Sequence, residues 1–132
     1  MEDLGFKLAT TEPLSGKSYI EVYPHTALLR LMKAKRRVPY KQSKRSKYWK
    51  DLTTEQRKQK LLKKRGSIVK ALEREVGPIE IPIDDTISLK PVEDALDAII
   101  CAWVGYKYAT DHAESLGDED AAIWTPVDGG DK

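Results

Sequence analysis

The chain has 132 residues, of which 40% are hydrophobic and 33% are charged, and its formal net charge is +2 at neutral pH. This length and composition predict one soluble globular domain with a modest core. A single cysteine, Cys101, excludes an internal disulfide and favours a reducing, cytoplasmic setting, while the absence of a signal-peptide pattern and of a long apolar run argues against secretion and membrane insertion.

The charges are strongly segregated along the sequence. Residues 33–70, here called the basic segment, hold 16 Lys and Arg against two acids, a net charge of +14, whereas the remainder holds 7 Lys and Arg against 19 acids, a net charge of −12. Such a segment attracts phosphate backbones or an acidic partner. A solvated face whose counter-charge lies on the acidic remainder explains the pattern equally well, so charge alone leaves both interpretations open.

The first regular element follows an irregular N-terminal stretch. KSYIEVYP alternates between two faces, with Ile20 and Val22 on one of them, and this predicts a strand at residues 18–23. Pro24 ends that strand and suits the first turn of a helix. Apolar residues at helical spacing then predict a helix at residues 25–35.

Residues 38–51 are rich in cations and show no clean period, which predicts a loop or an arm. Its aromatic residues either stack on the bases of a single strand or anchor the loop to the body, and we favour anchoring: Tyr40, Tyr48 and Trp49. The next helix is well signalled at residues 54–76, because Thr53 and Gln56 fit a capping box before an apolar stripe.

Two further elements complete the prediction. Pro91 opens a helix that we expect to run through residues 91–116, and AAIWTPV predicts a short final strand at residues 121–127. The stretch between the two long helices is expected to be extended or a loop. The predicted fold class is therefore α/β, with two short strands and three helices in a single domain.

Three acids begin the otherwise apolar run at residues 91–103, PVEDALDAIICAW, and Asp94 and Asp97 share one flank of the predicted helix. The dipole of a helix that begins at Pro91 explains Glu93 and, in part, Asp94. It does not explain Asp97, which requires a partner because burying a lone carboxylate is costly. We expect that partner to be an Arg, a Lys or a cation.

Glu21 raises a similar question, because it lies between apolar neighbours in the first predicted strand, where Glu is disfavoured. A solvent-facing position is the simpler explanation. The alternative is a metal site in which Glu21, Asp94 and Asp97 converge on Mg²⁺ or Mn²⁺, since carboxylates, water and substrate phosphates are the usual ligands of such ions. Two ions would activate water and stabilise the leaving oxygen in phosphodiester cleavage.

Four segments, YIEVYPHTALLRL, VPYK, PVEDALDAIICAWVGYKYA and AAIWTP, together resemble a prokaryotic family of unknown function described as predicted RNase H-like nucleases. The resemblance extends from Leu4 to Pro126. It implies an RNase H-like fold, here truncated and covering residues 1–132, with the basic segment as an insertion-like arm and helix. By the same resemblance Glu21 corresponds to a catalytic strand Glu, and Asp94 and Asp97 correspond to the acids of a late helix.

The family also begins with further strands, the first of which carries a catalytic Asp. No segment here matches them, and Asp3 lacks the context of a strand. The chain therefore resembles the C-terminal half of the family's domain. We expect a nuclease that is incomplete or inactive alone, with the missing strands supplied by a complementing chain. The open edge that half a sheet leaves also predicts pairing with another strand, and hence a homo-oligomer, or repacking.

Three hypotheses follow. The first is a metal-dependent nuclease acting on DNA or RNA, in which the phosphates are gripped by Lys41, Lys44, Arg45, Lys47 and Lys50. The second is a non-catalytic nucleic-acid-binding module that uses the basic segment. The third is an interaction protein whose basic helix meets an acidic partner. The sequence alone does not decide whether the chain is an enzyme.

Overall fold

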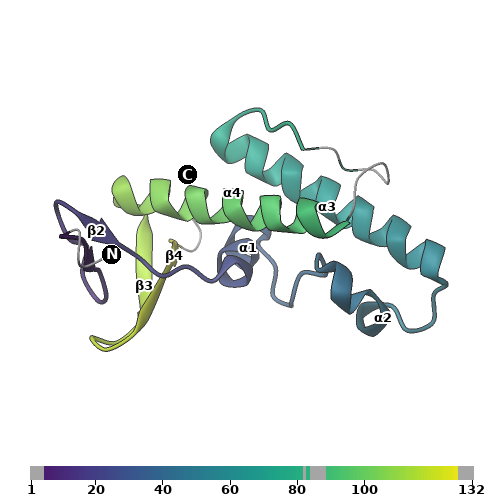
Figure 1. Cartoon of the computed structure of the whole chain (residues 1–132), viewed down its shortest axis with the longest axis horizontal. Coiled ribbons are helices and arrows are strands. Elements are labelled where there is room, and N and C mark those ends of the chain that lie inside the picture. Colours follow the sequence, from purple (N-terminus) through teal and green to yellow (C-terminus); the bar gives the residue numbers. More distant parts are fainter. Residues whose placement is uncertain (1–4, 82, 84–88, 128–132) are drawn as a thin grey trace.

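The computed structural model describes residues 5–81, 83 and 89–127, and its fold is mixed α/β (Figure 1). The helices within this part of the chain are α1 (Pro24–Met32), α2 (Arg45–Tyr48), α3 (Thr54–Val76) and α4 (Leu89–Ala109), with a 3-10 turn, η2 (Gln42–Lys44), before α2. The short strands form two separate pairs: parallel β1 (Lys7–Leu8) with β2 (Ser18–Tyr19), and antiparallel β3 (Ala113–Gly117) with β4 (Ala122–Pro126). Helix α4 lies along the molecule, with α2 toward one end and the β3–β4 hairpin toward the other (Figure 1).

Helix α3 confirms the prediction for residues 54–76. Its first turn carries the expected capping box, in which the Gln56 backbone N–H donates to Thr53 Oγ1 at 3.1 Å and the Thr53 N–H donates to Gln56 Oε1 at 2.9 Å. These bonds satisfy amides that a helix start otherwise leaves without partners. Gly77 then ends the helix with a φ of 96°, which a residue with a side chain rarely adopts.

Helix α4 departs from the predicted range 91–116 at both ends. It begins at Leu89 and ends at Ala109, and residues 113–117 form strand β3 instead of the last helical turns. Asp111, with a φ of 62°, turns the chain out of the helix, and β3 then pairs with β4 along its whole length. Local helical spacing could not reveal this strand, because its partner lies further along the chain. The predicted strand at 121–127 is confirmed as β4.

The predicted strand at residues 18–23 is wrong for most of its length, since only Ser18 and Tyr19 pair with β1. The predicted alternation of faces is nevertheless right. Ile20 and Val22 pack against the core, whereas Glu21 is exposed. The segment thus covers the core through two side chains, and its backbone joins β4 through a 2.9 Å hydrogen bond from the Trp124 N–H to the Glu21 carbonyl.

The next two elements also differ from the prediction. Helix α1 begins at Pro24, as its suitability for the first turn suggested, and stops at Met32 because Lys33 adopts a left-handed φ of 52°. The expected loop at 38–51 contains both η2 and α2. Anchoring is confirmed for Tyr40, which is completely buried, whereas Tyr48 and Trp49 are only partly buried.

The core lies where α1, α3, α4 and β4 meet. Its fully buried aliphatic side chains include Leu28, Ile68, Leu72, Leu96 and Ile100. Trp124 of β4 closes one side of this core and donates from Nε1 to the Ala9 carbonyl at 3.0 Å. Among the described residues, no helix has both the length and the apolar character needed to span a bilayer.

Candidate metal centre

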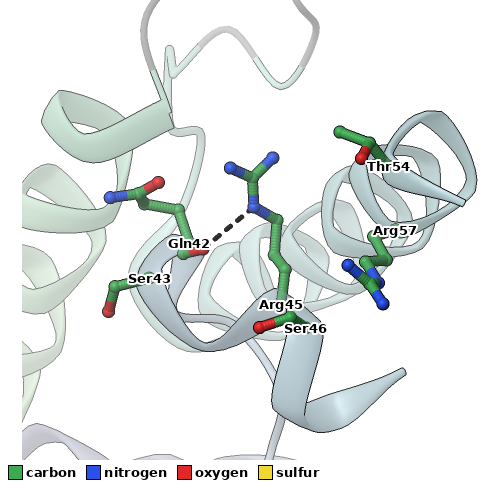
Figure 2. A pocket seen from close by; sticks show the side chains of 6 residues that line it. All are labelled: Gln42, Ser43, Arg45, Ser46, Thr54 and Arg57. Atoms are coloured by element: carbon green, nitrogen blue, oxygen red, sulfur yellow. Dashed lines mark hydrogen bonds between the residues drawn. The ribbon is translucent and has the colours of Figure 1, made fainter. Parts of the chain in front are cut away.

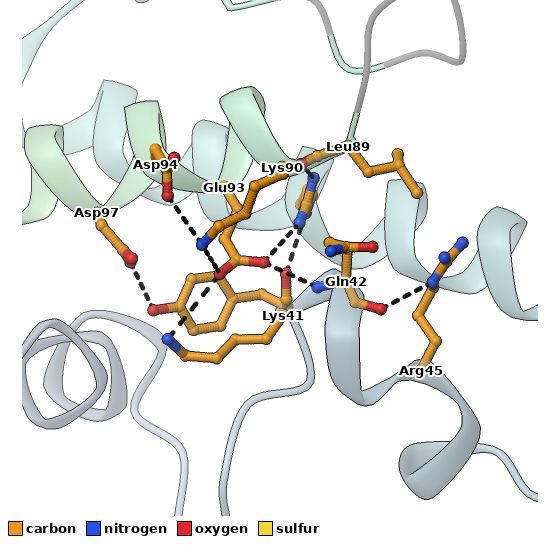
Figure 3. A network of polar contacts seen from close by, with 10 residues as sticks. Lys41, Gln42, Arg45, Leu89, Lys90, Glu93, Asp94 and Asp97 are labelled. Atoms are coloured by element: carbon orange, nitrogen blue, oxygen red, sulfur yellow. Dashed lines mark hydrogen bonds and ion pairs between the residues drawn. The ribbon is translucent and has the colours of Figure 1, made fainter.

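Three carboxylates gather on the first half of α4. Glu93, Asp94 and Asp97 each offer an oxygen, and these oxygens lie within 4.8 Å of one another. Positions 93 and 97 are one helical turn apart, and position 94 is adjacent on the same flank. Figure 3 shows the three side chains converging beside Lys41 and Lys90. Their environments differ sharply, so each must be considered separately.

Glu93 is a buried charge, only 3% exposed. Its carboxylate accepts from the Gln42 backbone N–H at 2.8 Å and pairs with Arg65 at 3.3 Å and Lys90 at 3.2 Å. The predicted explanation from the helix start is wrong, because α4 begins at Leu89 and holds no acid in its first turn. Glu93 instead provides the counter-charge at the junction of α4, α3 and η2.

Arg65 of α3 is the residue that sequence reasoning missed. It has no exposed surface, and it donates from Nε to the Tyr40 carbonyl at 3.0 Å and from Nη1 to the Leu89 carbonyl at 2.6 Å, besides pairing with Glu93. Burial lowers the pKa of Arg65, and the Glu93 carboxylate opposes that shift. A signal was present, because Arg65 falls four residues after Leu61 on the buried stripe of α3.

Asp97 has a partner of a different kind from the one predicted. The Tyr40 hydroxyl donates to Asp97 Oδ1 at 2.6 Å, so a neutral hydroxyl stands where we expected a cation. Burial, followed by this hydrogen bond, raises the pKa of Tyr40 well above its ordinary value, and the hydroxyl therefore stays protonated as a donor. One oxygen of a half-buried carboxylate is thereby held in place.

Asp94 is the open member of the group. Its side chain is 63% exposed and pairs with Lys90 at 3.0 Å. Lys90 also contacts Glu93 and is itself 56% exposed, so it is free to move aside when a ligand arrives. Cys101 lies one turn beyond Asp97, and burial raises the pKa of its thiol, which keeps it protonated near neutral pH.

Glu21 and the predicted phosphate contacts lie elsewhere. Glu21 is exposed in the segment between β2 and α1, and it is not a member of the carboxylate group. Most of the five predicted cations do not contact the acids of α4. The five lie in η2, in α2 and at the positions that flank them: Lys41, Lys44, Arg45, Lys47 and Lys50. Among these five, Lys41 comes within 4.0 Å of Glu93. The acidic group and the basic segment therefore meet at residues 40–42 and at Arg65.

The donor set fits a hard divalent cation. Two oxygens on opposite sides of one Mg²⁺ lie about 4.2 Å apart, since each bond is about 2.1 Å long. The observed spread of up to 4.8 Å requires only a small rotation of a side chain, which the exposed Asp94 permits. Asp94 and Asp97 would hold the ion, whereas Glu93 is already engaged by Arg65.

His25 supports the same region from α1. Its Nε2 accepts from the Val38 backbone N–H at 3.0 Å, and its ring contacts that of Tyr40 edge-on at 6.0 Å between centroids. Burial lowers the pKa of His25, and the nearby charges of Arg37, Lys41 and Lys44 lower it further. The neutral imidazole thus helps to fix the chain that leads to Tyr40.

Residues 1–122 match the model of a family described as "Protein of unknown function (DUF429)". The chain belongs to this family. No curated protein and no solved structure matched it. Membership of a family of unknown function is therefore confirmed for this DUF429 chain, whereas nuclease activity stays a prediction that depends on the acids of α4 and on the basic segment.

Proposed function

We propose that this DUF429 chain is part of a metal-dependent nuclease of RNase H-like type, which cleaves phosphodiester bonds of DNA or RNA. The observation that carries the proposal is the position of three clustered carboxylates at the edge of a segment with a net charge of +14. Metal-dependent phosphodiester cleavage needs both parts: oxygen ligands for the ion and cations for the nucleic-acid backbone.

The roles follow from the environment of each side chain. Asp94 and Asp97 are the proposed ligands of Mg²⁺ or Mn²⁺, and Tyr40 orients Asp97 by its hydrogen bond. When bound, the ion would activate water and stabilise the developing charge on the phosphate. Arg65 holds Glu93 at the junction, where Glu93 fixes the backbone of Gln42 and so the start of the phosphate-gripping stretch.

Glu21 completes the proposed set as the counterpart of the strand Glu that the family resemblance implies. Its exposure leaves the carboxylate free to approach a shared substrate or a second chain. The first-strand Asp of the resemblance is proposed to come from a complementing chain or segment. The cations proposed to bind phosphate are those of the basic segment around η2 and α2. The single cysteine is consistent with a protein of the cytoplasm.

A second candidate is a non-catalytic nucleic-acid-binding module, or a protein-interaction module, that uses the basic segment alone. One observation favours it: Arg65, Lys90 and Lys41 already lie near Glu93, and Lys90 also pairs with Asp94. These cations balance much of the acidic charge without a metal. Under this alternative the acids are structural, and only the cations meet nucleic acid.

The deciding experiment is cleavage of single- and double-stranded DNA and RNA in the presence of Mg²⁺ or Mn²⁺, by the chain alone and with its cellular partners retained. Asp97→Asn should abolish cleavage, whereas Asp120→Asn, in the exposed turn between β3 and β4, should not. Equal cleavage by the wild type and Asp97→Asn would reject the catalytic assignment. If the wild type binds nucleic acid without cleaving it, and Asp97→Asn binds with the same affinity, the second candidate is favoured.

A further inference from the structure

A cavity of about 220 Å³ lies between the η2–α2 stretch and the first turns of α3. Figure 2 shows the Arg45 side chain projecting between Gln42 and Thr54, with Ser46 and Arg57 beside it. The described residues of its lining all have polar side chains: Gln42, Ser43, Arg45, Ser46, Thr54 and Arg57. Two guanidinium groups, with no acid among the described residues of the wall, favour an anionic ligand.

The two arginines of the cavity differ from Arg30 and Arg65, which form ion pairs. Arg30 pairs with Glu114 and Arg65 pairs with Glu93, whereas neither Arg45 nor Arg57 pairs with any carboxylate of residues 5–81, 83 and 89–127. Their positive charge is therefore not balanced locally within the described structure. Two partly buried cations facing one cavity repel each other, and an anion placed between them relieves this repulsion.

Backbone carbonyls hold both guanidinium groups in position. Arg45 donates from Nε to the Gln42 carbonyl at 2.9 Å, and Arg57 donates to the Trp49 and Lys50 carbonyls at 2.8 and 3.0 Å. These bonds use the Nε of each arginine and one terminal nitrogen of Arg57. Both terminal nitrogens of Arg45 and one of Arg57 are thus left for a ligand, and charge-assisted bonds to phosphate are strong.

Hydroxyl groups and the start of α3 complete the wall. Ser43, Ser46 and Thr54 are exposed residues that line the cavity. Thr54 is the first residue of a helix of 23 residues, and the positive end of its dipole favours an anion there. Glu55 is the one acid of that first turn, and its carboxylate accepts from Gln59, one turn further along the helix, at 2.8 Å.

We propose that this cavity binds a phosphate group of a nucleic-acid strand, with Arg45 and Arg57 as its principal ligands; this rests on the proposed function for its substrate class. Gln42 links the cavity to the acids, because its side chain lines the cavity while its backbone N–H donates to Glu93. A strand held at the cavity therefore passes the edge of the acidic group. The cavity fixes the position of the substrate, and it performs no chemistry.

The test compares two double variants that remove the same charge. Arg45→Gln/Arg57→Gln removes the two cations of the cavity, and Lys60→Gln/Lys63→Gln removes two exposed cations of α3 outside it. Affinity for a labelled single-stranded oligonucleotide should fall at least about tenfold in the first variant, as expected for lost charged hydrogen bonds. The slope of log affinity against log salt should fall by about 0.7 for each lost phosphate contact. An equal loss of affinity in both variants would overturn the proposal.

Two further measurements address whether a loss of affinity comes from misfolding and whether the ligand is a nucleic acid or a free phosphate compound. Ser46→Asp leaves both arginines in place and introduces an anion at the cavity rim, and it should also weaken binding; unchanged affinity would count against the cavity. Inorganic phosphate should shift the backbone amide resonances of Ser46 and Thr54 in the wild type but not in the arginine variant. If phosphate shifts them while oligonucleotides do not bind, the nucleic-acid assignment is overturned, and a free phosphate compound is the ligand.

The outcome also separates this inference from the proposed nuclease function. Loss of binding in Arg45→Gln/Arg57→Gln, together with no cleavage by any preparation, would support the cavity and reject the nuclease. Cleavage that depends on Asp97, together with wild-type affinity in the arginine variant, would support the nuclease and reject the cavity.

Discussion

Glu93 and Asp94 are neighbours on α4, yet they occupy opposite environments. Glu93 is 3% exposed and engages Arg65, Lys90 and the Gln42 amide, whereas Asp94 is 63% exposed and pairs with Lys90. A carboxylate saturated inside the protein determines structure, while an open one is available to a ligand. Adjacent acids of the same charge thus have different roles, because Glu93 contacts η2 and α3 whereas Asp94 is open to solvent.

The largest loss of stability is expected when the buried acid, Glu93, loses its partner. Arg65→Met leaves the Glu93 carboxylate buried without its partner, and removing one member of a buried ion pair costs about 3–5 kcal/mol. Chemical denaturation should show a loss of this size. The double variant Arg65→Met/Glu93→Met should recover part of it, because neither charge is then stranded. A double variant as unstable as Arg65→Met would show that Arg65 acts mainly through its two carbonyl contacts.

A smaller loss is expected where the buried and open regions meet. Tyr40→Phe removes the donor to Asp97, and a hydrogen bond to a charged group contributes about 1.5 kcal/mol or somewhat more. Thermal and denaturant unfolding should both detect the change. Tyr106→Phe is the matched control, since Tyr106 is 59% exposed. Equal stability of the two variants would mean that water replaces Tyr40 at Asp97 without loss.

The pH dependence of stability should reveal His25 on the buried side. Because its pKa is lowered in the folded protein, the unfolded chain takes up a proton first as the pH falls. Stability should therefore decrease as the pH falls below the ordinary value of 6.5 and level off below the folded-state pKa. The decrease should vanish in His25→Gln and persist in His112→Gln. A pH profile that is unchanged in His25→Gln would assign the effect to other groups.

The smallest effect on stability is expected on the open side. Asp94→Asn removes an exposed contact with Lys90, and solvent screens such pairs so strongly that the free energy of unfolding should barely change. The same substitution should clearly weaken Mn²⁺ binding, measured by calorimetry, if Asp94 is a ligand. A large loss of stability would place Asp94 with Glu93 as a structural acid. Unchanged Mn²⁺ affinity would remove Asp94 from the proposed site.

Much of the fold could be predicted from local signals. Helix α3 was found at its observed bounds because a capping box and an apolar stripe are both written within a few residues. Strand β3 was missed because its pairing depends on β4, and residues 110–116 alone continue a helical pattern. The sequence identifies the carboxylates of α4, but it predicts a cation beside Asp97 and a helix-start role for Glu93. In the structure Glu93 pairs with the cation Arg65, and Asp97 accepts from the neutral hydroxyl of Tyr40. Their partners, Arg65 and Tyr40, lie far away in sequence.

The contacts of Arg65 also bear on how the protein assembles. Its partners are the carbonyl of Tyr40, 25 positions before it, the carbonyl of Leu89, 24 positions after it, and the carboxylate of Glu93, 28 positions after it. If only two of these three segments dock, a charge or a carbonyl is left unpaired in the interior, so such intermediates are disfavoured. Helix α3, the start of α4 and residues 40–42 should therefore open as one cooperative unit, with similar protection of their amides in native-state hydrogen exchange.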